Sequence, residues 1–122
     1  MPFPFENLDV YKKALDFVES IETLNTNLKG KASYSLIDQL SRAALSIPLN
    51  IAEGNGRWHK GDKRQFFWIA RGSTFECVPI LQVLQRKGLI SEVQYAGYYE
   101  QLDVMAKMLT NLVKSVEDLR KE

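Results

Sequence analysis

The sequence has few of the residues from which catalytic and metal sites are commonly built. Its 122 residues include one cysteine, Cys77, and one histidine, His59. A single cysteine excludes an intramolecular disulfide framework and agrees with a reducing compartment. A di-metal site in a helical bundle needs Glu-x-x-His on two helices, and the chain contains no such motif. We therefore expect neither a metal nor another cofactor.

Net charge and long apolar runs are also lacking. The formal charge is +1 at pH 7, so any nucleic-acid binding must come from a local patch. No apolar run approaches the roughly 20 residues of a membrane span. The beginning of the chain, MPFPFENLD, lacks the charged and then apolar pattern of a signal peptide. These absences predict a soluble, cytoplasmic protein without a membrane partner.

No arrangement of residues typical of an active site is apparent. The GNG run at 54–56 lacks the lysine and the spacing of a phosphate-binding loop. Cys77 falls beside a predicted core stripe with no apparent general base near it, which favours a small buried hydrophobe. Glu53 and Glu76 are predicted to lie roughly 30 Å apart on two helices, too far to act on one bond. We expect no catalytic residues, and an enzyme is only a remote alternative.

Helical periodicity runs along the whole chain. Apolar residues recur every three or four positions in four segments, which predict helices at roughly 7–28, 34–57, 62–87 and 91–119. Long amphipathic helices joined by short turns predict an all-α fold, an antiparallel up-down-up-down four-helix bundle in a single domain, 1–122. The predicted buried faces include Leu15 in the first helix and Ile69 in the third.

Capping residues indicate where these helices begin. Each start is expected at a residue whose side chain can accept a backbone N–H, with a Gln three residues later in two cases. The expected signals are Asn7, Ser33 or Ser35, Asp62 with Gln65, and Ser91 with Gln94.

Glycine, asparagine and proline indicate the ends and bends. Gly30 and Gly88 are expected to end the first and third helices, and Asn55 or Gly56 suits a left-handed residue after the second. Pro48 lies inside the second helix, where it removes one hydrogen bond and predicts a kink. The alternative, in which a new helix begins after Ser46, stays open.

The second predicted helix has a polar stripe beside its apolar one. These positions largely lack the Lys and Glu of an ordinary solvated face, and small residues lie among them, so the stripe suits a contact with another helix or subunit. Counting outward from the turn near Lys60 places Ser46 level with Ser73 and Arg42 level with Glu76, which predicts a salt bridge or hydrogen bond for the second pair. We interpret the stripe as an oligomer interface made of Gln39, Arg42, Ser46, Asn50 and Glu53, supported by Ser73 and Glu76.

Two motifs carry a family resemblance. SIPLNIAEGNGR at 46–57, followed by FFWIARGSTFE at 66–76, resembles a family of four-helix-bundle proteins encoded in intervening sequences of bacterial large-subunit ribosomal RNA genes. The accessory variability protein of diversity-generating retroelements is similar to them. The resemblance covers nearly the whole chain. It implies a pentameric ring, and the retroelement relative implies nucleic-acid binding through a basic surface.

The turn between the second and third helices is the one local concentration of charge. Four cations stand against Asp62, and two rings between them could stack on unpaired bases. The structural alternative is an ordinary charged turn in which Trp58 covers the end of the bundle. The candidate nucleic-acid-binding residues are Arg57, Trp58, His59, Lys60, Lys63 and Arg64.

We therefore expect a non-enzymatic homo-oligomer, a pentamer, that binds RNA or other nucleic acid through this turn. A scaffold that docks a partner protein, with the turn as a solvated loop, is the alternative. Binding that weakens steeply with salt would separate the first from the second.

Overall fold

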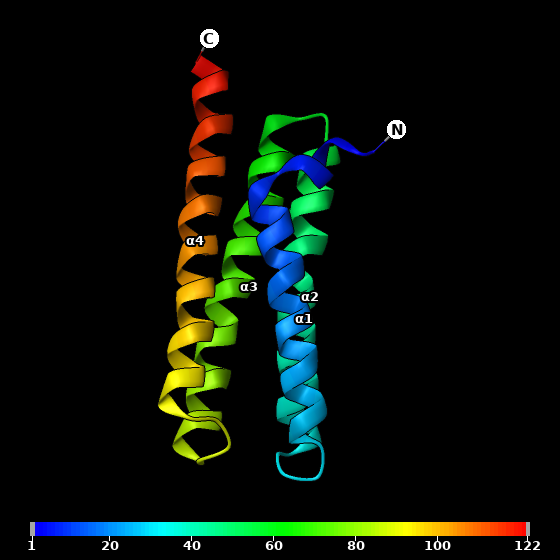
Figure 1. The fold of residues 1–122 in the computed structure, drawn as a ribbon. Coiled ribbons are helices and arrows are strands. Elements are labelled where there is room, and N and C mark those ends of the chain that lie inside the picture. Colours follow the sequence, from blue (N-terminus) through cyan, green and yellow to red (C-terminus); the bar gives the residue numbers. More distant parts are fainter. Residues whose placement is uncertain (1, 122) are drawn as a thin grey trace.

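Four long helices, each antiparallel to the next along the chain, make up the computed structural model, which describes residues 2–121 and the side chains of residues 2–117. A short 3-10 helix, η1 (Pro4–Asn7), precedes α1 (Asp9–Leu28), α2 (Tyr34–Gly56), α3 (Lys60–Arg86) and α4 (Glu92–Lys121). Figure 1 shows the α2–α3 turn at the same end as the beginning of α1, with the α1–α2 and α3–α4 turns at the other end. The predicted four-helix bundle is confirmed.

Two of the predicted helix starts are made by side-chain caps. At α4, the Ser91 backbone N–H donates to Gln94 Oε1 at 2.8 Å, and the Gln94 N–H donates to Ser91 Oγ at 3.1 Å. This reciprocal pair is the predicted capping box. At α2, the Leu36 N–H donates to Ser33 Oγ at 3.2 Å, so Ser33 rather than Ser35 is the cap.

The other two predicted starts were wrong. Asn7 belongs to η1, whose turn is closed by the Phe3 N–H donating to Glu6 Oε2 at 2.6 Å, and α1 begins after Leu8. Because α3 already begins at Lys60, Asp62 lies within its first turn and forms no capping box. A carboxylate in that position is still favourable, since it faces the positive end of the helix dipole.

Two glycines end helices as predicted. Gly30 and Gly88 have φ values of +80° and +74°, in the left-handed region that favours glycine. The left-handed residue predicted at Asn55 or Gly56 was wrong, because Gly30 and Gly88 are the described residues with positive φ. Instead, α2 ends where Arg57 becomes extended, and the Lys63 ammonium donates to the Asn55 carbonyl at 2.7 Å. A lysine thus takes up a carbonyl freed at the end of the helix.

The proline in α2 does not divide it. Pro48 is buried within one helix that runs from Tyr34 to Gly56, which excludes the alternative of a new helix after Ser46. The core therefore receives a continuous apolar face from α2, centred on Leu40, Ala44, Ile47 and Ile51.

The core lies along the axis of the bundle and is formed by all four helices. Its largest fully buried side chains include Phe17, Leu40, Leu81 and Leu109. Two predicted core residues are in fact on the surface: Leu15 is 39% exposed and Ile69 is 43% exposed. In residues 2–121, no helix is long and apolar enough to cross a bilayer.

At Gly54, α2 packs tightly against two phenylalanines of α3. A Cβ placed there would lie 3.0 Å from Phe66 Cβ and 2.7 Å from Phe67 Cε1, and the second distance is shorter than real Cβ contacts. Phe67 is itself buried, so its ring has little room to move. A glycine is therefore required where α2 meets the first turns of α3.

We predict that Gly54→Ala lowers the free energy of unfolding by about 1–3 kcal/mol, because the added methyl overpacks this contact. Gly56→Ala is the matched control, since a Cβ at Gly56 meets nothing within 4 Å. Urea unfolding of both variants measures the difference. A Gly54→Ala variant as stable as the Gly56→Ala variant would contradict the close-packing explanation.

Candidate nucleic-acid interface

The α2–α3 turn presents a nearly bare tryptophan at one end of the bundle. Trp58 is 90% exposed, and its neighbours Arg57 and His59 have extended backbones. Among the described residues, no aromatic or cation–π partner of Trp58 is found. Trp58 therefore does not cover the end of the core, which was the structural alternative for this residue.

The cations in the turn have intramolecular partners. The Arg57 guanidinium lies 3.1 Å from the Glu53 carboxylate and 4.6 Å from the centre of the Phe66 ring. Lys63 donates to the Asn55 carbonyl, as described above. Arg64 lies 4.0 Å from the Glu117 carboxylate on α4. These contacts hold the cations close around the turn.

The carboxylates of the turn balance much of its positive charge. Glu53 lies beside Arg57, Glu117 lies beside Arg64, and Asp62 belongs to the same turn. The Arg57–Glu53 and Arg64–Glu117 pairs are partly exposed, and such pairs contribute roughly 0–1 kcal/mol each. A phosphate can therefore replace a carboxylate at low cost, although the net positive charge offered by one copy is small.

The centre of the predicted polar stripe joins α2 to α3 within one chain. Ser73 Oγ donates to Ser46 Oγ at 2.8 Å, which confirms that these two residues lie level. The Asn50 amide donates to Ser46 Oγ at 2.9 Å and to the Ser46 carbonyl at 2.8 Å. Ser73 is buried, and Ser46 and Asn50 are half-buried. These three residues form a hydrogen-bonded layer between two helices.

The ends of the stripe lie on the surface. The predicted Arg42–Glu76 pair was wrong, because the Arg42 guanidinium lies 3.1 Å from the Asp38 carboxylate, one turn earlier on the same helix. Gln39, Arg42, Glu53 and Glu76 are all exposed. These four side chains therefore take no part in the hydrogen bonds among Ser46, Asn50 and Ser73.

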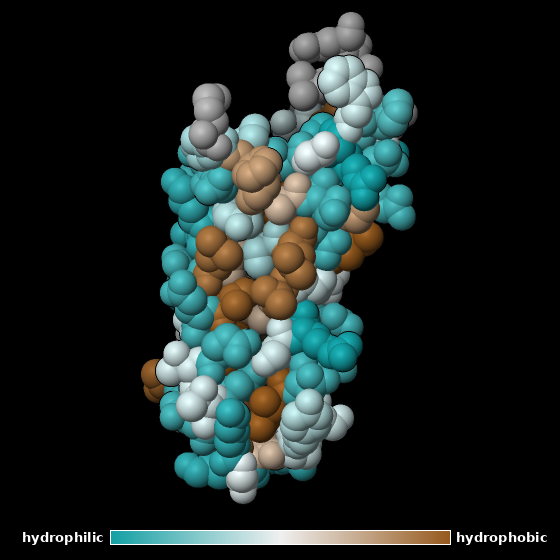
Figure 2. All heavy atoms as spheres, turned by 90° about the vertical axis from the view of Figure 1, so that its right-hand side faces the viewer, coloured by the Kyte–Doolittle hydropathy of each residue, from teal (hydrophilic) through white to brown (hydrophobic). Residues whose placement is uncertain are grey.

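Exposed apolar side chains lie on the outer side of α2, which was missed from the sequence. Leu45 is 47% exposed and Leu49 is 57% exposed. Figure 2 shows hydrophobic residues gathered along the middle of the face made by α1 and α2, bordered by hydrophilic ones. The signal was present in the sequence, because Leu45 and Leu49 repeat at a spacing of four but out of phase with the core stripe.

A second exposed surface is rich in aromatic residues and lies on α3 and α4. Trp68, Phe75 and Tyr99 are each about half exposed. The Arg71 guanidinium lies over both the Trp68 and Phe75 rings, at 5.1 and 4.5 Å from their centres, and its Nε donates to Thr110 on α4. Arg71 is thus occupied in fixing α3 against α4.

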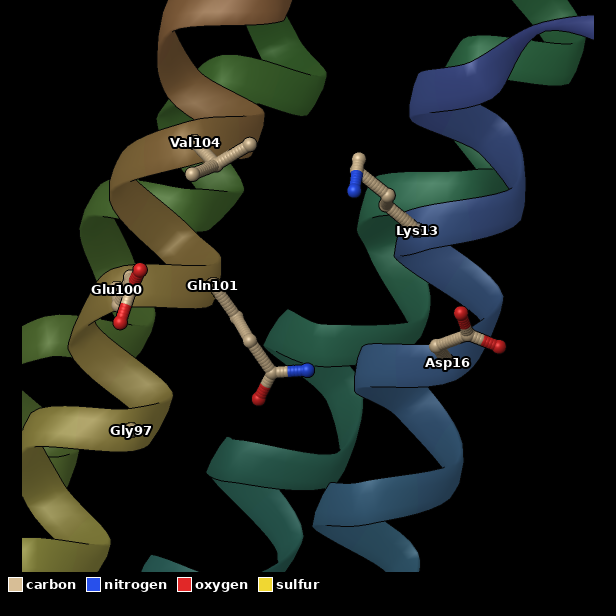
Figure 3. A pocket seen from close by; sticks show the side chains of 6 residues that line it. All are labelled: Lys13, Asp16, Gly97, Glu100, Gln101 and Val104. Carbon is tan, nitrogen blue, oxygen red and sulfur yellow. The ribbon is translucent and has the colours of Figure 1, made fainter.

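A groove between α1 and α4 has mixed charge. Figure 3 shows Lys13 of α1 and Gln101 of α4 pointing into the space between the two helices, with Asp16 and Glu100 at its sides. Two carboxylates beside one ammonium do not favour a polyanion. Among the surfaces described, the α2–α3 turn is the better candidate for nucleic acid.

Nothing in the described residues forms a metal site: no three His, Cys, Asp or Glu side chains lie close enough together.

Cys77 is fully buried in the core. Burial, with a smaller contribution from the charge of Glu76, raises the pKa of its thiol to about 12. The thiol is therefore protonated at neutral pH and is a poor nucleophile.

Comparison with known proteins agrees with this architecture. The family model for the 23S rRNA-intervening sequence protein matches residues 6–111. The chain belongs to this family. No curated protein matches the chain. A solved structure of a protein of unknown function from the S23 ribosomal protein family of Bacteroides thetaiotaomicron is similar, with 25% identity and a TM-score of 0.82, and the match covers 86% of this chain and 98% of that one.

The family match confirms the resemblance carried by the two motifs, and the structure explains part of it. Gly54 of NIAEG meets Phe66 and Phe67, and Ser73 of IARGS bonds Ser46. In this member of the 23S rRNA-intervening sequence protein family, the two motifs therefore face each other across the α2–α3 contact. Neither the family nor the similar structure is recognised as an enzyme.

We predict a pH dependence of stability that comes from Cys77. Its thiol pKa is raised from 9.0 to about 12 in the folded chain, so above pH 9 the unfolded chain releases a proton that the folded chain retains. The stability that Cys77 contributes is present below pH 9 and falls by up to about 1.4 kcal/mol per pH unit above it. Urea unfolding from pH 7 to 10.5 should show the wild-type advantage over Cys77→Ala shrinking above pH 9. A constant difference would contradict the burial of the thiol.

Proposed function

We propose that this protein is a non-enzymatic homo-oligomer, a pentamer, that binds RNA or other nucleic acid through the α2–α3 turn. The observation that carries the proposal is the gathering of Arg57, Lys60, Lys63 and Arg64 around one end of the bundle. Cations are the groups that bind a phosphate backbone. The turn also lies away from the α1–α4 groove, where the carboxylates of Asp16 and Glu100 would repel a phosphate backbone.

The proposed function requires assembly, because a single turn offers too few positive charges to bind a phosphate backbone tightly. Four cations that displaced counterions from a single strand would give a slope of about −3 in a plot of log affinity against log salt. The carboxylates of Glu53, Asp62 and Glu117 make this slope shallower. Several copies of the turn at one end of a ring would add their contributions, so oligomerisation converts a weak patch into a useful one.

Exposed residues of α2, together with Glu76 of α3, are the proposed contact between copies. Leu45 and Leu49 supply the apolar centre, and Gln39, Arg42, Glu53 and Glu76 supply a polar rim. Such an apolar centre within a polar rim is typical of protein interfaces. Ser46, Asn50 and Ser73 act indirectly, because they fix α2 against α3 within each copy.

The aromatic surface around Trp68, Phe75 and Tyr99 favours a second candidate, a scaffold that docks a partner protein. Trp, Tyr and Arg are the residues most often found at the centres of protein interfaces. In that case the turn is a solvated loop, and nucleic-acid binding is absent.

We predict that Lys63→Glu with Arg64→Glu weakens the RNA binding that native protein shows at low salt. Loss of two cations should make the log-affinity slope shallower by about 1.5 per protomer. The matched control is Lys29→Glu with Lys31→Glu, which makes the same charge change in the α1–α2 turn at the other end of the bundle. Fluorescence anisotropy at several salt concentrations measures both. Equal loss in the two variants would mean that net charge, rather than the α2–α3 turn, is responsible.

We predict that Leu49→Glu dissociates the oligomer, because it places a charge in the apolar centre of the contact. Val93→Glu is the control, since Val93 is 83% exposed at the start of α4, away from the proposed contact. Sedimentation equilibrium should give a pentamer mass for native protein and for Val93→Glu, and a smaller mass for Leu49→Glu. A native monomer would refute the assembly.

A further inference from the structure

The two tryptophans have different environments. Trp68 is 42% exposed and its ring is covered by the Arg71 guanidinium at 5.1 Å. Trp58 is 90% exposed, with nearly the whole indole surface open. The indole face of Trp58 is therefore available to a ligand, whereas that of Trp68 is occupied by Arg71.

The backbone position of Trp58 is set by the residues around it. It is the middle residue of a three-residue connection between α2 and α3. Both neighbours are extended, Arg57 at φ −77°, ψ 145° and His59 at φ −83°, ψ 136°. The Arg57–Glu53 ion pair and the Lys63 bond to the Asn55 carbonyl tie the two ends of the connection to α2. The connection therefore sets the backbone position of Trp58 between the two helices and leaves its indole exposed.

The charges beside Trp58 make phosphate contacts alone insufficient. Glu53 and Glu117 lie against two of the four cations, and Asp62 adds a third carboxylate to the turn. A ligand recognised only by its phosphate backbone, such as a double helix, would meet a nearly neutral surface. An attractive contact that does not depend on charge is needed, and an open indole supplies one through stacking on a base.

Stacking selects the form of the nucleic acid. In a double helix the faces of the bases are covered by their neighbours, and the major groove of an RNA duplex is too narrow for a side chain to enter. Only an unpaired base offers a free face to an indole. We infer that Trp58 stacks on an unpaired base, so that the ligand of the turn is a single-stranded segment of nucleic acid rather than a duplex. This inference rests on the proposed function.

The test uses intrinsic fluorescence in a Trp68→Phe background, where Trp58 is the remaining tryptophan. The probes are a strand of about 12 nucleotides without self-complementarity, as RNA and as DNA, and the duplex that each forms with its complement. We expect quenching of Trp58 by the single strands and not by the duplexes. Trp58→Ala should weaken single-strand binding at least about tenfold, and Trp58→Phe should retain most of it, because a phenyl ring also stacks.

The controls separate failure of this inference from failure of the proposed function. If Trp58→Ala binds single strands like native protein while Lys63→Glu with Arg64→Glu does not, the stacking inference is wrong and the proposed function stands. Equal affinity of native protein for strand and duplex would also overturn the inference. If native protein binds neither probe, the proposed function itself fails. Circular dichroism and oligomer mass of each variant exclude unfolding as the cause.

Discussion

The contact between α2 and α3 is the constraint on which the rest of the structure depends. At one end Gly54 allows Phe67 and Phe66 to approach its Cα, and two turns away Ser46 and Ser73 share a hydrogen bond. A steric contact and a directional one, at different heights, fix both the distance and the register of the two helices. A slip of either helix would leave the buried Ser73 hydroxyl without Ser46 and place a side chain against Phe67. The geometry of the α2–α3 turn follows from this register.

This contact also determines which residues are left for other partners. Because Ser46, Asn50 and Ser73 bond to one another, the polar centre of α2 faces inward. The outer side of the same helix then carries Leu45 and Leu49, which no helix of this chain covers. One helix thus presents an apolar face to the core, a polar one to α3 and a second apolar one to solvent. Leu45 and Leu49, one turn apart, form this third face.

Much of the fold could be predicted from the sequence because helical periodicity and capping act locally. The Ser91–Gln94 box and the glycine ends at Gly30 and Gly88 depend on neighbours within a few residues, and they were predicted correctly. Counting from the turn also placed Ser46 beside Ser73, since short side chains leave little choice of partner. The same count failed for Arg42, because its long side chain reaches Asp38 on its own helix first. Ile69 was placed in the core because periodicity cannot tell a face toward the core from a face toward a helix edge.

The candidate site was less predictable because a sequence gives the charges of a turn but not their partners. Four cations beside Asp62 suggest a strongly basic patch, yet Glu53 and Glu117 come from the end of α2 and from α4 to lie beside Arg57 and Arg64. Glu53 reaches Arg57 from one turn earlier on α2, whereas Glu117 reaches Arg64 because α4 packs beside α3. These carboxylates change the expected mode of binding: weak electrostatic attraction from each copy, directional stacking from Trp58, and addition over several copies. The proposed assembly surface on the side of α2 adjoins the turn at Glu53, which pairs with Arg57, so assembly and binding at the turn are expected to influence each other.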